Sequence, residues 1–153
     1  MPKIDIEGMG WKGGSGYPSP FRERVEGRVR KRLGDAVGLD QFGVNLTRLA
    51  PGAQSALRHW HENEDEFVFI VEGEVVLIED AGETVLRPGD AAGFKAGVFD
   101  GHHLVNRTDR DAVYLEIGTR AETERAHYPD DDLLAEKDAT GFRFLHKDGS
   151  SYD

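Results

Sequence analysis

The sequence has no cysteine and no long apolar run. Disulfides and thiolate metal sites are therefore both excluded, and any bound metal must use nitrogen and oxygen ligands. The longest apolar run is Phe67–Val71, far shorter than the roughly 20 residues of a membrane-spanning helix. The start of the chain also lacks the basic and apolar regions of a signal peptide. We expect a cytoplasmic protein with no membrane partner.

Basic residues are scarce as well. Lysine and arginine total 19 against 29 aspartate and glutamate residues, which gives a formal net charge of -10. A chain of this charge repels the phosphate backbone of nucleic acids, and only residues 22–32 are locally basic. We therefore expect no nucleic-acid partner. The length of 153 residues, of which 38% are hydrophobic, is typical of one compact domain with a single sizeable core.

No interior segment has a convincing helical period, whereas the alternation typical of strands recurs. Residues 1–21 are rich in glycine and proline and predict an irregular arm. Phe42, Val44 and Leu46 then alternate with small or polar residues, which predicts a strand with one buried face. Further strands are expected in the segments 56–61, 66–71, 74–79, 83–86 and 112–118.

Short strands separated by glycine and proline turns favour an all-β sandwich or barrel. The segment from Thr123 onward is acidic and weakly patterned. We interpret it as a surface excursion that ends in one short closing strand.

The chemistry of the chain is concentrated in its histidines. His59 and His61 are spaced i, i+2, which on a strand places both rings on one face, and Glu66 opens the next predicted strand. A fourth donor is available from His102 or His103. Three imidazoles and one carboxylate form a ligand set that suits a divalent transition metal such as Mn, Fe, Ni or Zn.

The spacing around these residues resembles the first motif of the single-domain cupins, in the cupin 2 conserved barrel family. That motif is a glycine, a short spacer, His-x-His, a glutamate after three or four residues, and a glycine six residues later. The matching residues here are Gly52, His59, His61, Glu66 and Gly73. Only the first spacer is one residue longer than usual.

The second cupin motif is similar to the segment "GDAAGFKAGVFDGHHLVN". Its matching positions are Gly89, Gly97, His102 and Asn106, and Lys95 stands where the family usually has proline. Four residues instead of two separate the second glycine from the histidine. The spacing to Asn106 selects His102 over His103 as the ligand. The resemblance therefore implies a metal site formed by His59, His61, Glu66 and His102.

The resemblance also implies the fold and the organisation of the chain. We expect a double-stranded β-helix, or jelly roll, with the metal inside one mouth of the barrel and a homodimer as the assembly. The barrel core is expected at residues 42–120. An N-terminal arm with leading strands, residues 1–41, precedes it, and a C-terminal extension, residues 121–153, packs on it within a single domain.

Four protein ligands leave about two positions open on a six-coordinate ion, enough for two neighbouring oxygens of a small substrate. A metal so placed suits the isomerisation of a sugar or sugar phosphate, an activity found among proteins of this family. A substrate phosphate would need cationic partners, which could be Lys95, the best placed by sequence, Arg48, Arg58 or the basic segment 22–32. The alternatives are a small-molecule binding or sensor cupin without turnover, a metal dioxygenase or lyase, and a structural or storage barrel.

Overall fold

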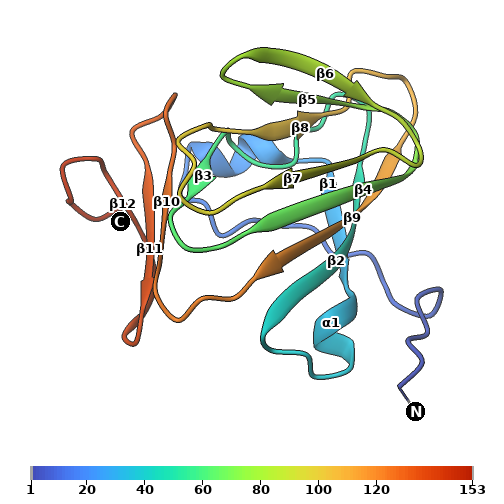
Figure 1. Cartoon of the computed structure of the whole chain (residues 1–153), viewed down its shortest axis with the longest axis horizontal. Coiled ribbons are helices and arrows are strands. Elements are labelled where there is room, and N and C mark those ends of the chain that lie inside the picture. The colour runs from blue at the N-terminus through green and yellow to red at the C-terminus, as the bar shows by residue number, and fades with distance from the viewer. Residues whose placement is uncertain (1, 153) are drawn as a thin grey trace.

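The computed structural model describes residues 2–152 and has an almost entirely antiparallel β architecture (Figure 1). Within those residues the helical segments are a 3-10 turn, η1 (Phe21–Val25), and one short helix, α1 (Leu33–Ala36). Neither is long and apolar enough to cross a membrane. The strands are β1 (Arg28–Arg32), β2 (Phe42–Leu49), β3 (Trp60–His61), β4 (Glu66–Glu72), β5 (Val75–Glu79), β6 (Gly82–Leu86), β7 (Ala91–Phe94), β8 (His103–Val105), β9 (Ala112–Thr119), β10 (Glu124–His127), β11 (Leu134–Asp138) and β12 (Gly141–Leu145). The all-β prediction is confirmed.

The strands form three sheets. The largest has the order β1-β2-β9-β4-β7, a second has the order β6-β5-β8, and the third has the order β12-β11-β10-β3. In Figure 1 the third sheet stands at the left of the barrel and joins it through β3. Because β3 carries a predicted metal ligand, the C-terminal strands are attached directly to the candidate site.

The main core lies between the first two sheets. Leu49, Ile70 and Ala112 of the first sheet are fully buried in the same cluster as Val75 of the second. Gly73 joins the two sheets with a φ of +74°, and a Cβ at this position would lie 2.5 Å from the backbone oxygen of Asp111. Only glycine satisfies both the conformation and the close approach.

The strand predicted at residues 42–47 is present as β2, but the suggestion that its apolar side is the buried one is wrong. Thr47 and Leu49 are fully buried, whereas Phe42 is 39% exposed. Gly43 and Asn45, on the same side as Thr47, line a cavity that is open to solvent on one side. The inner face of β2 is therefore without apolar side chains where it borders this cavity and becomes apolar at Leu49, in the core. The side chains of Phe42, Val44 and Leu46 face the outside of the barrel.

The prediction of a surface excursion with one short strand after Thr123 is also wrong. This segment forms β10, β11 and β12, three antiparallel strands that continue through β10 to β3. A second apolar cluster supports them, with Leu57 and Leu133 fully buried and Tyr17 of the N-terminal arm packed among them. The predicted strand 56–61 is shorter than expected, since only its last two residues are strand.

Candidate metal centre

The two histidine segments are joined by direct backbone pairing. The backbone N–H of His59 donates to the oxygen of His102 at 3.2 Å, and the reverse bond is 2.9 Å long. His61 follows two residues later in β3. The ring centroid of His59 lies 4.8 Å from that of His61 and 4.9 Å from that of His102. The pairing of the two segments thus brings three imidazoles into one cluster.

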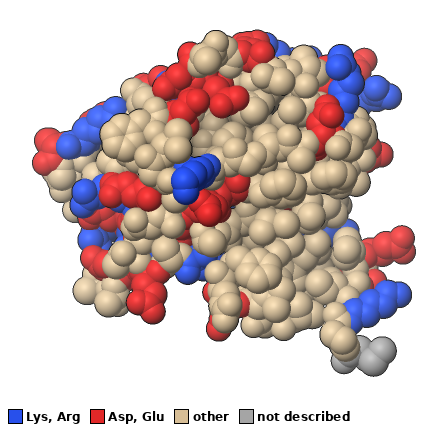
Figure 2. All heavy atoms as spheres, in the orientation of Figure 1, with Lys and Arg blue, Asp and Glu red and all other residues tan. Residues whose placement is uncertain are grey.

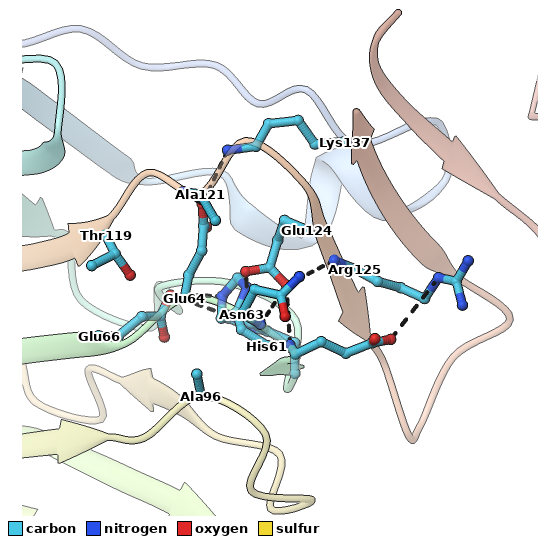
Figure 3. A network of polar contacts seen from close by, with 12 residues as sticks. His61, Asn63, Glu64, Glu66, Ala96, Thr119, Ala121, Glu124, Arg125 and Lys137 are labelled. Carbon is cyan, nitrogen blue, oxygen red and sulfur yellow. Dashed lines mark hydrogen bonds and ion pairs between the residues drawn. The ribbon is translucent and has the colours of Figure 1, made fainter. Parts of the chain in front are cut away.

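The carboxylate of Glu66, at the start of β4, lies close to all three rings, and Figure 3 shows it beside His61. Its Oε1 is 2.8 Å from Nε2 of His61 and 3.6 Å from Nε2 of His59, and its Oε2 is 2.6 Å from Nε2 of His102. The ligand atoms of His59, His61 and Glu66 all lie within 4.8 Å of one another, a group that could hold a metal ion. All three rings therefore turn Nε2 toward one carboxylate.

Electrostatics within the cluster favour the ionised carboxylate. Burial raises the pKa of Glu66, but the hydrogen bonds with His102 and His61 and the nearby ring of His59 outweigh it and hold the pKa well below its usual range. Burial lowers the pKa of His61, whereas contacts with Glu66 and Glu124 raise it to a net value above the ordinary one. The pKa of His102 is lowered, mainly by burial. A metal needs an ionised carboxylate and neutral imidazoles, so protons and metal compete here.

The cluster borders a cavity of about 460 Å³ whose lining is rich in cations. Arg28, Arg30 and Arg120 line it, against the carboxylates of Glu66 and Glu116. This balance is opposite in sign to the net charge of the chain, -10. A cavity lined in this way favours an anionic ligand.

The side chain of Arg30 is held at the cavity wall by an ion pair with Glu116. Arg30 of β1 lies opposite Thr47 of β2 in the antiparallel pair, and the side chain of Thr47 is fully buried, so both residues face the inside of the barrel. Nε of Arg30 lies 2.8 Å from Oε1 of Glu116, and Asn45 donates to the same oxygen at 3.1 Å. This pairing fixes the guanidinium of Arg30 at the cavity wall.

Lys95 and Arg48, two of the cations considered as substrate partners, do not line the main cavity. Arg48 is on the outer face of β2, with its guanidinium 4.7 Å from the ring centroid of Trp11. Lys95 is exposed and borders a second hollow of about 220 Å³, which His61 and His102 also line. Arg28 and Arg30, which belong to the basic segment 22–32, line the main cavity, and their i, i+2 spacing on a strand places them on one face.

Residues far from the two histidine segments complete the site. Tyr128 lines the cavity with its ring centroid 5.7 Å from that of His59, and Tyr17 packs against it edge to face. Burial raises the pKa of both phenols, so both remain neutral hydrogen-bond donors at neutral pH. Glu124 approaches the other side of His61 (Figure 3). No local motif marks these positions, because long-range strand pairing brings them here.

Comparisons with known proteins agree with this architecture. The family model of the cupin domain matches residues 45–118. The crystal structure of a sugar phosphate isomerase from a cupin superfamily, from Silicibacter pomeroyi, is 51% identical, with a TM-score of 0.95 over 99% of this chain and 97% of that chain. This chain is a cupin. The double-stranded β-helix predicted from its motifs is confirmed.

Two further structures resemble this cupin more distantly. A protein from Acidithiobacillus ferrooxidans, provisionally described as a sugar phosphate isomerase, is 28% identical with a TM-score of 0.74, over 82% of this chain and 80% of that chain. The polyketide cyclase RemF from Streptomyces resistomycificus is 18% identical with a TM-score of 0.65, over 78% and 79% of the two chains, and shares the fold alone. No curated protein matches the chain.

The donor set of this cupin fits a divalent transition metal. Nδ1 of His59 is 2.7 Å from the backbone oxygen of Leu57, which assigns the ring proton to Nδ1 and leaves the Nε2 lone pair facing Glu66. Metal-binding histidines are commonly oriented in this way by a second partner. The chemistry of imidazole and carboxylate accepts Mn, Fe, Ni or Zn.

Proposed function

We propose that this cupin is a metal-dependent isomerase of a small anionic sugar, with a sugar phosphate as the substrate class. One observation carries the proposal: the cluster of histidines and Glu66 borders the same cavity as Arg28 and Arg30. A metal centre and a cationic wall in one cavity can bind the two ends of an oxygen-rich anion. The similarity to a protein described as a sugar phosphate isomerase supports the same assignment.

His59, His61, Glu66 and His102 are the proposed ligands of one divalent ion. When bound, such an ion supplies Lewis-acid chemistry, which polarises a carbonyl and acidifies the neighbouring C–H group. His102 is buried, and His59, His61 and Glu66 are partly exposed toward the cavity, so the open positions of the ion would face a bound substrate.

The remaining residues of the cavity hold the substrate. Arg30 and Arg28 bind its anionic group, since guanidinium groups match the geometry of phosphate oxygens. Tyr128 stays protonated because burial raises its pKa, and it donates a hydrogen bond to a substrate oxygen near His59. The substrate is thereby oriented between the cationic wall and the ligand cluster.

The test begins with elemental analysis of protein purified without chelator or affinity metal, followed by assays of the metal-loaded protein. We expect near-unit occupancy by one transition metal and interconversion of an aldose phosphate and its ketose. The matched control is the His102→Ala variant, which should lose both. Oxygen consumption with bound iron, or cleavage of the substrate, would replace the isomerase with an oxygenase or a lyase. Tight binding without turnover would establish a binding or sensor cupin.

The proposed assembly is a homodimer formed through the outer face of the five-stranded sheet. Phe67 and Phe69 of β4 are 41% and 39% exposed. They lie beside Ile117 and Leu115 of β9, so that apolar side chains continue across neighbouring strands. In Figure 2 the acidic side chains gather over the upper and left parts of the face shown, and uncharged residues cover most of the area over β9 and β2. An apolar area of this kind favours burial against a second copy.

A further inference from the structure

A buried carboxylate lies behind His61, on the side of the ring that faces away from Glu66 (Figure 3). It belongs to Glu124, the first residue of β10 and one of the few charged residues that are more than nine-tenths buried. β10 pairs with β3 through Ala126 and His61, so the C-terminal sheet determines where Glu124 sits.

One oxygen of Glu124 is fully used by the backbone. Oε1 accepts hydrogen bonds from the N–H groups of Glu62, Asn63 and Arg125, at 3.0, 3.1 and 2.7 Å. Three such donors fix the position of the carboxylate and leave Oε2 pointing elsewhere.

The second oxygen of Glu124 and one nitrogen of His61 are both buried without a hydrogen-bond partner among the described residues. These atoms, Oε2 of Glu124 and Nδ1 of His61, lie 3.8 Å apart. Unsatisfied buried polar atoms are costly, and two of complementary character this close are natural partners. A shift of about 1 Å would bring them to hydrogen-bond distance.

We propose that Glu124 is a positioning residue for the metal centre. Its Oε2 accepts a hydrogen bond from Nδ1–H of His61 and thereby directs the lone pair of Nε2 toward the metal. His59 is held in the same way by the backbone oxygen of Leu57, at 2.7 Å from Nδ1. The proposal rests on the metal site of the proposed function, and it assigns to the C-terminal sheet a role in holding a ligand.

Replacement of Glu124 by glutamine separates positioning from structural support. In Glu124→Gln the amide oxygen should remain on the three backbone N–H groups, because only an acceptor fits there. The amide NH₂ then faces Nδ1 of His61 and disfavours a proton on that atom. The matched control is Glu62→Gln, since the side chain of Glu62 contacts His127 and not His61.

Two measurements test the proposal, one of them without metal. In metal-free wild type, NMR should detect a protected Nδ1–H proton on His61 in addition to the Nε2–H that faces Glu66, and Glu124→Gln should lose the Nδ1–H proton. The affinity for Zn²⁺, measured by competition with a chelator, should fall roughly 10- to 100-fold in Glu124→Gln and stay unchanged in Glu62→Gln, with similar melting temperatures for both metal-free variants.

The proposal is overturned if Glu124→Gln keeps the protected Nδ1–H proton, or if it binds Zn²⁺ as tightly as wild type. It is equally overturned if Glu62→Gln loses affinity to the same extent. A wild-type protein that binds no transition metal would instead overturn the proposed function, while the Nδ1–H proton of His61 still decides whether Glu124 holds the ring.

Discussion

The imidazole of His102 lies flat against the ring of Phe94, with centroids 3.6 Å apart and ring planes 2° apart. Phe94 is the last residue of β7 and pairs with Glu66 of β4. The same aromatic residue therefore packs on one candidate ligand and aligns with the strand position of another. Stacking of this kind limits the orientations that the imidazole can adopt.

Replacement of Phe94 by leucine should weaken metal binding with little change in stability. Leucine preserves most of the apolar volume but loses the flat ring, and aromatic pairs contribute about 0.5–1.5 kcal/mol beyond their buried area. The expected loss of metal affinity is roughly 2- to 12-fold. Calorimetric titration of metal into the metal-free variant measures it, and an affinity equal to that of wild type would show that the stacking is incidental.

His102 and His103 should differ sharply when each is replaced by alanine. Nε2 of His102 is 2.6 Å from Glu66, whereas Nδ1 of His103 is 2.8 Å from the backbone oxygen of Ala56. We expect His102→Ala to lower metal affinity by at least about 100-fold, because even partners outside the ligand set contribute 10- to 100-fold. His103→Ala should bind metal nearly as wild type does. The reverse ranking, measured by the same titration, would reassign the ligand.

Local spacing accounts for what the sequence predicts about the site. The separation of His59 and His61, the six residues from Glu66 to Gly73 and the turn at Gly73 are properties of short segments. These spacings predict which side chains share a face, because successive residues of a strand point to opposite sides. The four residues predicted as ligands consequently lie together in the structure, as do the strands that carry them.

Long-range pairing accounts for what the sequence does not predict. Arg30 and Arg48 are both basic residues on strands, and only the pairing of β1 with β2 places the first in the cavity and the second outside. Glu124 reaches His61 through β10, far along the chain. Strands of antiparallel sheets usually turn apolar residues inward and polar residues outward. Along the cavity β2 does the reverse, since Asn45 faces inward.

Removal of the metal should lower the melting temperature. An ion that binds only the folded state stabilises it by about 2.7 kcal/mol at a free concentration of 100 times Kd. For a chain of this size that corresponds to roughly 5–10 °C, since each kcal/mol moves Tm by about 2–4 °C. Thermal unfolding with and without chelator measures the shift. An unchanged Tm after verified removal of the metal would show that metal binding does not stabilise the folded protein.

A charge on the outer face of the five-stranded sheet should dissociate the proposed dimer. Phe69 is 39% exposed on β4, and Val85, on the separate sheet that contains β6, is 40% exposed. Phe69→Lys should convert the protein to a monomer, because burial of an unpaired charge at an interface is unfavourable. Val85→Lys should leave the dimer intact. Sedimentation velocity compares the two, and a monomeric wild type or dissociation by Val85→Lys alone would reject this interface.

Arg30 and Arg48 provide the sharpest comparison for substrate binding. Arg30 lines the cavity beside Glu116, whereas Arg48 packs outside on Trp11, so Arg30→Gln and Arg48→Gln remove equal charge from opposite faces of one sheet. A hydrogen bond to a charged group contributes about 1.5–3 kcal/mol, so Arg30→Gln should raise KM for a sugar phosphate roughly 10- to 150-fold.

Arg30→Lys should recover part of the loss, because it keeps the charge without the fork of donors. Inorganic phosphate offers a second measurement: as a competitive inhibitor it should lose affinity in Arg30→Gln and keep it in Arg48→Gln. A larger effect of Arg48→Gln in either assay would place the anionic group outside the cavity, near Arg48.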